Sequence, residues 1–442
     1  VIFENVTVWT NEAEGIISNA TVITENGKIK SIIRGSSSYT VPAGAKVINA
    51  EGKHLTAGII DEHSHIAISK GVNESGQAIS CEVRIGDVVT ADDINVYRQL
   101  SGGVTAAQLL HGSANPVGGQ SALIKLKWGH LPQDYLIKNA PKFVKFALGE
   151  NVKQANWGDF NTTRFPQTRM GVEQVYIDGF SRALAYHEAL TKPAKGTTPP
   201  ARDLELDALY EIVKGERKIT CHSYIQSEIN MLMHVADSFG FTVNTFTHIL
   251  EGYKVADKMK AHGAGASTFS DWWAYKYEVK DAVPFNASLM HQMGIVVAIN
   301  SDDAEMGRRL NQEAAKVIKY GGISEEEAWK MVTLNPAKLL HLDDRMGSVK
   351  VGKDADLVLW TTNPLSIEAK VLYTLVDGEI LFDRAADFEA QKTMEAERAR
   401  IIAKMAEAGK GGEPTKPFVK KRRGSYHCNT VGEEASTEAN EH

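Results

Sequence analysis

Cysteine is scarce, since Cys81, Cys221 and Cys428 are the only three in 442 residues. Three scattered cysteines exclude a disulfide framework and a thiolate metal cluster. No uninterrupted apolar run reaches the roughly 18 residues of a membrane-spanning helix. The Gly-x-Gly-x-x-Gly motif of dinucleotide-binding proteins is also missing after every predicted strand. The sequence therefore disfavours a small disulfide scaffold, a membrane-spanning protein and a nicotinamide-dependent enzyme.

Positive charge is not in excess either. Lys and Arg number 49 and Asp and Glu number 55, which gives a formal net charge of −6. Because a mildly acidic chain offers no broad basic surface, no nucleic-acid partner is expected. Charge and size fit a monomer and a homo-oligomer equally well. The sequence begins with the strand-like VIFENVTVW and has no recognisable signal segment, so cytoplasmic and exported locations are both open.

Apolar strands alternate with amphipathic helical segments over residues 58–340, which indicates parallel βα units. Roughly eight such strands favour an α/β fold of the (β/α)8 TIM-barrel type. Residues 1–57 and 341–384 consist of short strands and turns, so we expect the two ends to pair as one small β-sandwich domain. Residues 385–442 read as a charged helical segment followed by a polar tail.

Histidines and one aspartate follow several of the predicted barrel strands, where the active site of such a barrel lies. His63 and His65 are two residues apart after a buried strand, and two imidazoles on one face suit a divalent metal such as zinc. His222 and His248 each end a later strand. Asp302 follows another and is placed to act on a metal-bound water, while its neighbour Asp303 suits a helix N-cap.

A bridging carboxylate between two metals has two candidates. Glu150 lies at the tip of the strand that contains Phe143–Leu148, and Lys145 lies within that strand, where carbamylation would supply a carboxylate. Glu150 is favoured because the other predicted ligands also act from strand tips. Cys221 is rejected as a nucleophile because it points to the opposite face of its strand from His222.

Taken together, these motifs resemble the amidohydrolase superfamily of metal-dependent hydrolases. The resemblance covers about residues 1–384 and is carried by Gly58–His65, His222, Thr247-His248, Ser301-Asp302, Asn335–Lys338 and Asp354–Val358. The imidazolonepropionase-related subgroup, which includes prolidase-like dipeptidases, is the most similar. The resemblance implies one or two divalent metals, most simply zinc. It assigns His63, His65 and Asp302 to the first metal and His222 and His248 to the second, and it makes Asp302 the proton shuttle.

The activity that this resemblance implies is hydrolysis of a C–N bond in an amide, dipeptide, N-acyl amino acid or cyclic amide. A metal-dependent ring deaminase is the alternative, and a catalytically silent scaffold is a third hypothesis that the complete ligand set disfavours. The expected partner is a small molecule or short peptide. An arginine in a loop after a strand would clamp a substrate carboxylate. The candidate substrate-binding residues are His111, Asn115, Trp157, Arg164 and Arg169.

Overall fold

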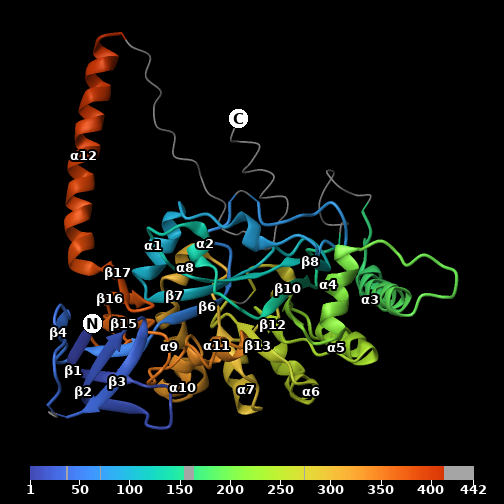
Figure 1. Cartoon of the computed structure of the whole chain (residues 1–442), viewed down its shortest axis with the longest axis horizontal. Coiled ribbons are helices and arrows are strands. Elements are labelled where there is room, and N and C mark those ends of the chain that lie inside the picture. Colours follow the sequence, from blue (N-terminus) through green and yellow to red (C-terminus); the bar gives the residue numbers. More distant parts are fainter. Residues whose placement is uncertain (36–37, 70, 154–163, 273, 413–442) are drawn as a thin grey trace.

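The computed structural model describes residues 1–35, 38–69, 71–153, 164–272 and 274–412. The strands of these segments form sheets of eight, six and three strands. The eight-stranded sheet is built from both ends of the chain, and the two smaller sheets come from the middle (Figure 1).

The eight-stranded sheet joins the N-terminal and C-terminal segments. Its central contact is an antiparallel pairing of β5 with β15, in which Ala57 lies opposite Leu357. Apolar side chains such as Phe3, Val8 and Leu359 pack into one shared core. Because the strands bury this core together in a single sheet, the two opposed sheets of the expected sandwich are not seen among the described strands. The strands are β1 (Ile2–Trp9), β2 (Ile16–Glu25), β3 (Lys28–Arg34), β4 (Val47–Asn49), β5 (His54–Ala57), β15 (Leu357–Trp360), β16 (Val371–Val376) and β17 (Glu379–Asp383).

The middle of the chain is an α/β arrangement, but its described strands do not close into one hydrogen-bonded barrel. They form a six-stranded sheet, β14-β13-β12-β11-β10-β8, and a three-stranded sheet, β6-β7-β9. The segment of β8 and β9, interrupted at Ser121, takes part in both sheets, because β8 pairs antiparallel with β10 and β9 pairs antiparallel with β7. The strands are β6 (Ile59–Ser64), β7 (Val104–Leu109), β8 (Val117–Gln120), β9 (Ala122–Lys125), β10 (Lys142–Ala147), β11 (Arg217–His222), β12 (Thr245–Thr247), β13 (Gly265–Thr268) and β14 (Val297–Ile299).

Helices with an apolar side cover these strands. In α5, Ile229, Leu232, Met233 and Ala236 are buried at helical spacing, and Gly240 ends the helix with a φ of 75°. The other helices are α1 (Ile94–Leu100), α2 (Pro132–Tyr135), α3 (Arg169–Thr191), α4 (Leu204–Val213), α6 (Ala256–His262), α7 (Asn286–Gln292), α8 (Ala304–Gly307), α9 (Leu310–Gly321), α10 (Glu325–Lys330), α11 (Leu334–Leu339) and α12 (Arg384–Lys410), with α5 spanning Gln226–Phe239.

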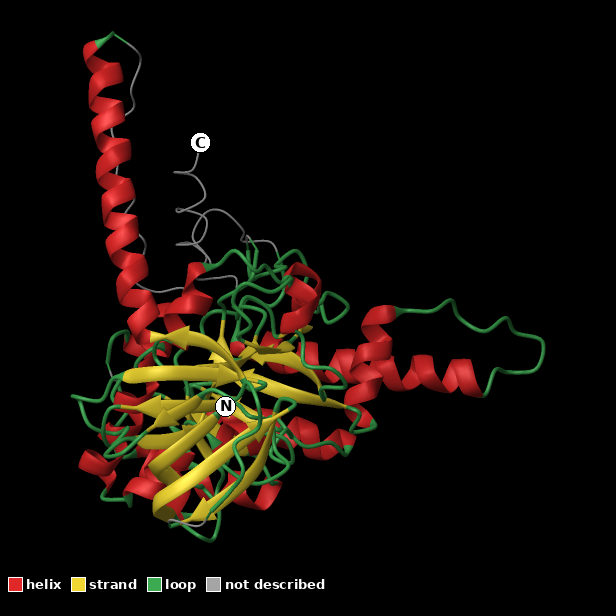
Figure 2. Cartoon of the chain, turned by 60° about the vertical axis from the view of Figure 1, so that its left-hand side comes forward, coloured by secondary structure: helices red, strands yellow, loops and turns green. Residues whose placement is uncertain are grey.

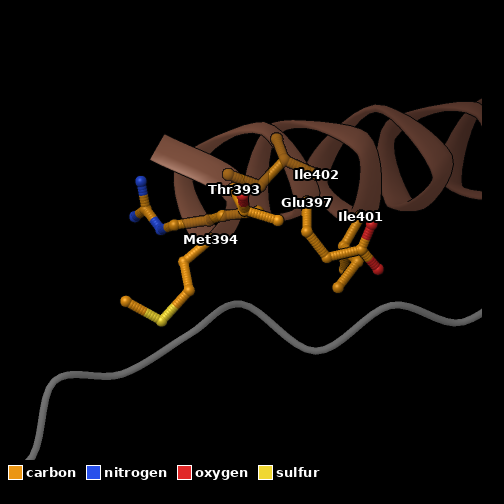
Figure 3. Close-up of a pocket in the computed structure, with 6 residues that line it drawn as sticks. Thr393, Met394, Glu397, Ile401 and Ile402 are labelled. Carbon is orange, nitrogen blue, oxygen red and sulfur yellow. The ribbon is translucent and has the colours of Figure 1, made fainter. Parts of the chain in front are cut away.

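Helix α12 stands away from the rest of the molecule in both views (Figures 1 and 2). None of its residues is buried. Met394, Ile401 and Ile402 lie along its surface and line a shallow hollow with Glu397 (Figure 3). Among the described helices, α12 included, none is both long enough and apolar enough to cross a membrane.

A buried ion cluster connects the middle of the chain to the eight-stranded sheet. Lys125 of β9 is 5% exposed, and its Nζ lies 2.8 Å from Asp354 and 2.9 Å from Asp356. It also pairs with Asp377 in the turn between β16 and β17. Because a buried charge needs partners, the contacts of Lys125 with these three carboxylates hold the two parts of the fold together.

We expect Lys125→Met to lower the free energy of unfolding by about 3–5 kcal/mol, because it leaves the buried Asp356 carboxylate without its cation and takes one partner from Asp354 and Asp377. Urea denaturation of the full chain measures this change. Lys127→Met is the matched control, since Lys127 also pairs with Asp377 but is 23% exposed. Its effect should be about 0–1 kcal/mol. Equal, small losses in both variants would show that the cluster does not hold the parts together.

Candidate metal centre

Three predicted ligands meet where β6 and β14 end. Nε2 of His63 lies 3.2 Å from Nε2 of His65, and Oδ1 of Asp302 lies 3.2 Å from the first and 3.3 Å from the second. Ligand atoms at about 2.0–2.1 Å from a tetrahedral zinc ion are separated by about 3.3–3.4 Å. The three atoms therefore already form one face of a coordination tetrahedron.

Hydrogen bonds on the far side of each ring set the direction of both imidazoles. Nδ1 of His65 lies 2.9 Å from the carbonyl oxygen of Leu110, which can only accept, so Nδ1 carries the proton. Nδ1 of His63 lies 3.0 Å from Oγ1 of Thr247, which donates to Glu62 at 2.9 Å. In both rings the lone pair of Nε2 is left to point toward Asp302, as metal-binding histidines require.

His222 and His248 lie beside this group, at the ends of β11 and β12. Their ring centroids are 4.3 Å apart, and the His248 ring stacks on His63 at 5.0 Å. Both rings are fully buried, and within the described part of the chain neither ring nitrogen of either histidine has a hydrogen-bond partner. Burial lowers the pKa of His248 to about 3 and that of His222 well below its ordinary value. Two neutral imidazoles with unused nitrogens fit a second metal position.

Asp302 is held in place by backbone contacts. Its amide donates to the carbonyl of His63 at 3.0 Å, and the preceding Ser301 donates to both carboxylate oxygens of Asp61. Asp302 and His248 have φ angles of 47° and 36°, and non-glycine residues in this region are typical of functional sites. Burial alone would raise the pKa of Asp302, but the surrounding His65, His248 and Lys145 side chains hold it below its ordinary value.

The two candidates for the bridging position lie in different surroundings. Lys145 is fully buried, and its Nζ is 3.4 Å from Nε2 of His63. The carboxylate of Glu150 instead pairs with Lys153 at 2.9 Å and with Arg169 at 2.8 Å. Gly149, with a φ of 86°, turns the chain just before Glu150. The structure therefore brings Lys145, and not Glu150, into the histidine cluster.

The predicted substrate residues are mostly committed to the protein itself. Both ring nitrogens of His111 bond to backbone, at Glu74 and Gly112, and burial lowers its pKa to about 4. The guanidinium of Arg164 donates to Asn115 and to the carbonyl of Ala114. These three residues therefore fix loops instead of presenting free polar groups.

Arg169, the other predicted arginine, pairs with three carboxylates, namely those of Glu150, Glu228 and Glu278. Trp157 lies outside the described residues. The sequence reasoning missed the partners that orient the ligands, Glu62 and Thr247, because no spacing rule marks a residue that acts through a neighbouring ring. It also missed Tyr224, whose ring packs on His222 at 4.5 Å.

Comparison with known proteins agrees with this arrangement. A sequence profile of the Amidohydrolase family matches residues 54–420, which is most of the chain. The chain belongs to the amidohydrolase family. It is 28% identical over 393 residues to Amidohydrolase tasK of Hapsidospora irregularis, covering 82% of this chain but only 40% of that protein. It is 23% identical to an imidazolonepropionase of Thermoplasma volcanium, covering 84% of this chain and 93% of the relative.

Solved structures of the family share the fold. An amidohydrolase from Thermotoga maritima MSB8 superposes with a TM-score of 0.78 at 28% identity, over 87% of this chain and all of that one. A putative prolidase from Bifidobacterium longum gives a TM-score of 0.55 at 16% identity, over 88% of this chain and 97% of the other. These likenesses establish the fold class.

We expect Thr247→Val to weaken metal binding about 10- to 100-fold, because the Nδ1 proton of His63 loses its acceptor. Metal retention against a competing chelator measures the change. Thr245→Val is the matched control, since Thr245 is also buried on the same strand but accepts a hydrogen bond from Asn244, which is not a predicted metal ligand. If both variants release metal alike, the effect comes from strand packing and not from His63.

Proposed function

We propose that this chain is a divalent-metal-dependent hydrolase of C–N bonds, and that its substrates are amides, dipeptides, N-acyl amino acids or cyclic amides. The observation that carries the proposal is the cluster of His63, His65 and Asp302, whose facing atoms are 3.2–3.3 Å apart. The ring nitrogens of His222 and His248, which no described residue satisfies, support a second metal beside it. When bound, such metals supply a hydroxide near neutral pH and polarise the carbonyl under attack.

Asp302 would move the proton in this reaction. Its carboxylate is buried and has a lowered pKa, so it is ionised at neutral pH and able to accept a proton at Oδ1 or Oδ2. It would take this proton from the attacking water and give it to the leaving nitrogen, first as general base and then as general acid. The backbone bond to His63 and the contacts of Ser301 with Asp61 would keep the carboxylate in the same position through both transfers.

Lys145 is the better candidate for the bridging carboxylate. Lys145 is fully buried beside the predicted metal ligands, where a negative charge would be balanced by a bound cation. Attack of the neutral Nζ on carbon dioxide forms a new N–C bond, releases one proton and leaves a carbamate with one negative charge. That charge would face the metal positions, since Nζ is 3.4 Å from His63. Glu150 would then act only in the ion network around Arg169.

We expect Asp302→Asn to lower kcat by about 10²–10⁴-fold on any substrate found, because the amide cannot accept the proton. A panel of dipeptides, N-acyl amino acids and cyclic amides, assayed for amine release and for ammonia, measures it. Asp303→Asn is the matched control, since the Asp303 carboxylate caps α8 through Glu305 and Met306. It should change kcat little. If no dipeptide, N-acyl amino acid or cyclic amide is hydrolysed, but ammonia is released from a ring amine, the deaminase alternative would replace the proposal.

The Lys145 carbamate has a direct signature. We expect protein prepared with ¹³C-bicarbonate to show a carbamate carbon by NMR that Lys145→Gln removes and Glu150→Gln retains. Metal per chain should fall in the Lys145 variant only. A carbamate signal that survives in Lys145→Gln, or metal loss confined to Glu150→Gln, would return the bridging role to Glu150.

A further inference from the structure

Helix α12 exposes apolar side chains that the rest of the described chain leaves uncovered. The helix is fixed to the molecule near its first turn, where Tyr97 donates a hydrogen bond to Asp387. Beyond that turn, all residues from 388 to 407 are exposed. Because helices in proteins are stabilised mainly by packing of an apolar face, this face is expected to have a partner. Four apolar side chains in this stretch are 45–63% exposed, namely Met394, Ile401, Ile402 and Met405.

The four side chains share one face of the helix because of their spacing. They follow the pattern i, i+7, i+8 and i+11, and at about 100° per residue they fall within about 100° of the circumference. Met394, Ile401 and Ile402 line the same shallow hollow (Figure 3). A spacing of this kind is typical of the apolar seam between two paired helices. One copy of α12 therefore presents one half of such a seam.

The charges of α12 complement those of a second α12 that runs in the opposite direction. Residues 384–397 contain four acidic and two basic side chains, whereas residues 398–410 contain four basic and one acidic. Two antiparallel copies place the acidic part of each helix beside the basic part of the other. Complementary charge of this kind selects a partner and its orientation. The partner that best matches α12 is therefore its own copy.

One register brings the apolar side chains of two such copies together. With the two-fold axis between residues 399 and 400, Met394 of one copy lies opposite Met405 of the other, and Arg398 lies opposite Ile401. In a parallel pair, Arg398 would instead lie opposite its own counterpart in the middle of the seam, where like charges repel. The antiparallel orientation is therefore favoured by the seam as well as by the net charge of each half.

We propose that α12 binds α12 of a second copy of this chain as an antiparallel helix pair, which makes the protein an elongated dimer. The helix has 27 residues, so at about 1.5 Å per residue it is about 40 Å long. The axis of the pair lies about 23 Å from the start of the helix, which keeps the two molecules apart. Because α12 stands away from the rest of the chain in both views, a second helix can lie along it (Figures 1 and 2). Four apolar side chains per copy make a small contact, so we expect a dissociation constant of about 1–100 µM.

Sedimentation velocity of the full chain, over a concentration range that spans this constant, tests the dimer. We expect Ile401→Lys to raise the dissociation constant about 10- to 100-fold, because an apolar contact is lost and the new ammonium faces Arg398. Ile367→Lys is the matched control, since Ile367 is 83% exposed but lies in the turn between β15 and β16. It should leave the dimer unchanged. Both variants should fold and bind metal as the parent does, because both positions are exposed.

A chain that stays monomeric at every concentration would overturn the proposal and leave this face of α12 to a partner other than a second copy. A dimer that Ile401→Lys does not weaken, or that Ile367→Lys weakens equally, would also overturn it, because the contact would then lie elsewhere on the molecule.

Charge reversal tests the register. Glu397 and Lys404 are seven positions apart on one flank of the seam, and in this register each faces the other residue in the second copy. We expect Glu397→Lys and Lys404→Glu to weaken the dimer about 3- to 10-fold each, and the two changes in one chain to restore it. Within its own helix, Glu397 pairs with Arg400 at 2.7 Å, and the double variant does not restore that contact. Recovery therefore reports contact between copies, and its absence would contradict the register.

Cysteine cross-linking tests the orientation without any need for catalytic activity. Met394→Cys and Met405→Cys are made separately in a Cys428→Ser background, in which the two remaining native cysteines are buried. We expect a disulfide-linked dimer when the two variants are mixed and oxidised, and none from either variant alone. Identical positions would be about 16 Å apart along the antiparallel pair, beyond the reach of a disulfide. Efficient cross-linking of Met394→Cys with itself, or no cross-link in the mixture, would overturn the antiparallel pair.

Discussion

The arrangement of this protein depends on the burial of four imidazoles and one carboxylate at one edge of its parallel strands. Uncompensated polar groups of this kind are costly inside a protein, because they lose water and gain no partner. His222 and His248 carry ring nitrogens that no described residue satisfies, while His63, His65 and Asp302 crowd to 3.2–3.3 Å. A divalent cation offsets both costs at once, since it accepts the lone pairs and balances the carboxylate.

Around this cluster, the protein fixes three of the predicted ligands, His63, His65 and Asp302, by contacts that do not face the cluster. Leu110 and Thr247 orient two rings, and Asp61 holds the backbone before Asp302. The side chains that the sequence suggested for substrate binding also stabilise the protein, at a greater distance from the cluster. Arg164, Asn115 and His111 hold loops together. Rigid support of this kind keeps ligand positions within the few tenths of an ångström that metal coordination demands.

Most of the ligand cluster was predictable from the sequence, because its logic is local. His63 and His65 follow a buried strand at a spacing of two, and His222, His248 and Asp302 end strands whose carboxyl ends must meet at one edge of the sheet. The choice between Lys145 and Glu150 for the bridging position was not predictable, because the path of the chain beyond the end of a strand depends on the turn that follows. Gly149 adopts a φ of 86°, and Arg169 attracts the Glu150 carboxylate away, neither of which the strand pattern contains.

Contacts between segments that are far apart in the sequence were harder to predict. The sequence shows strands at both ends of the chain, and the structure joins them in one eight-stranded sheet, because Leu357 pairs with Ala57, 300 positions earlier in the sequence. The segment of β8 and β9 pairs antiparallel with strands of both smaller sheets. The sequence marks this segment only by two short strands.

The most direct test of this account is the metal content of the purified full chain, measured by plasma mass spectrometry after expression in metal-replete medium. The account predicts at least one divalent ion per chain, held by His63, His65 and Asp302, and two if a carbamate on Lys145 joins the second histidine pair. A chain that is folded, as judged by circular dichroism, and yet holds no divalent metal would contradict it.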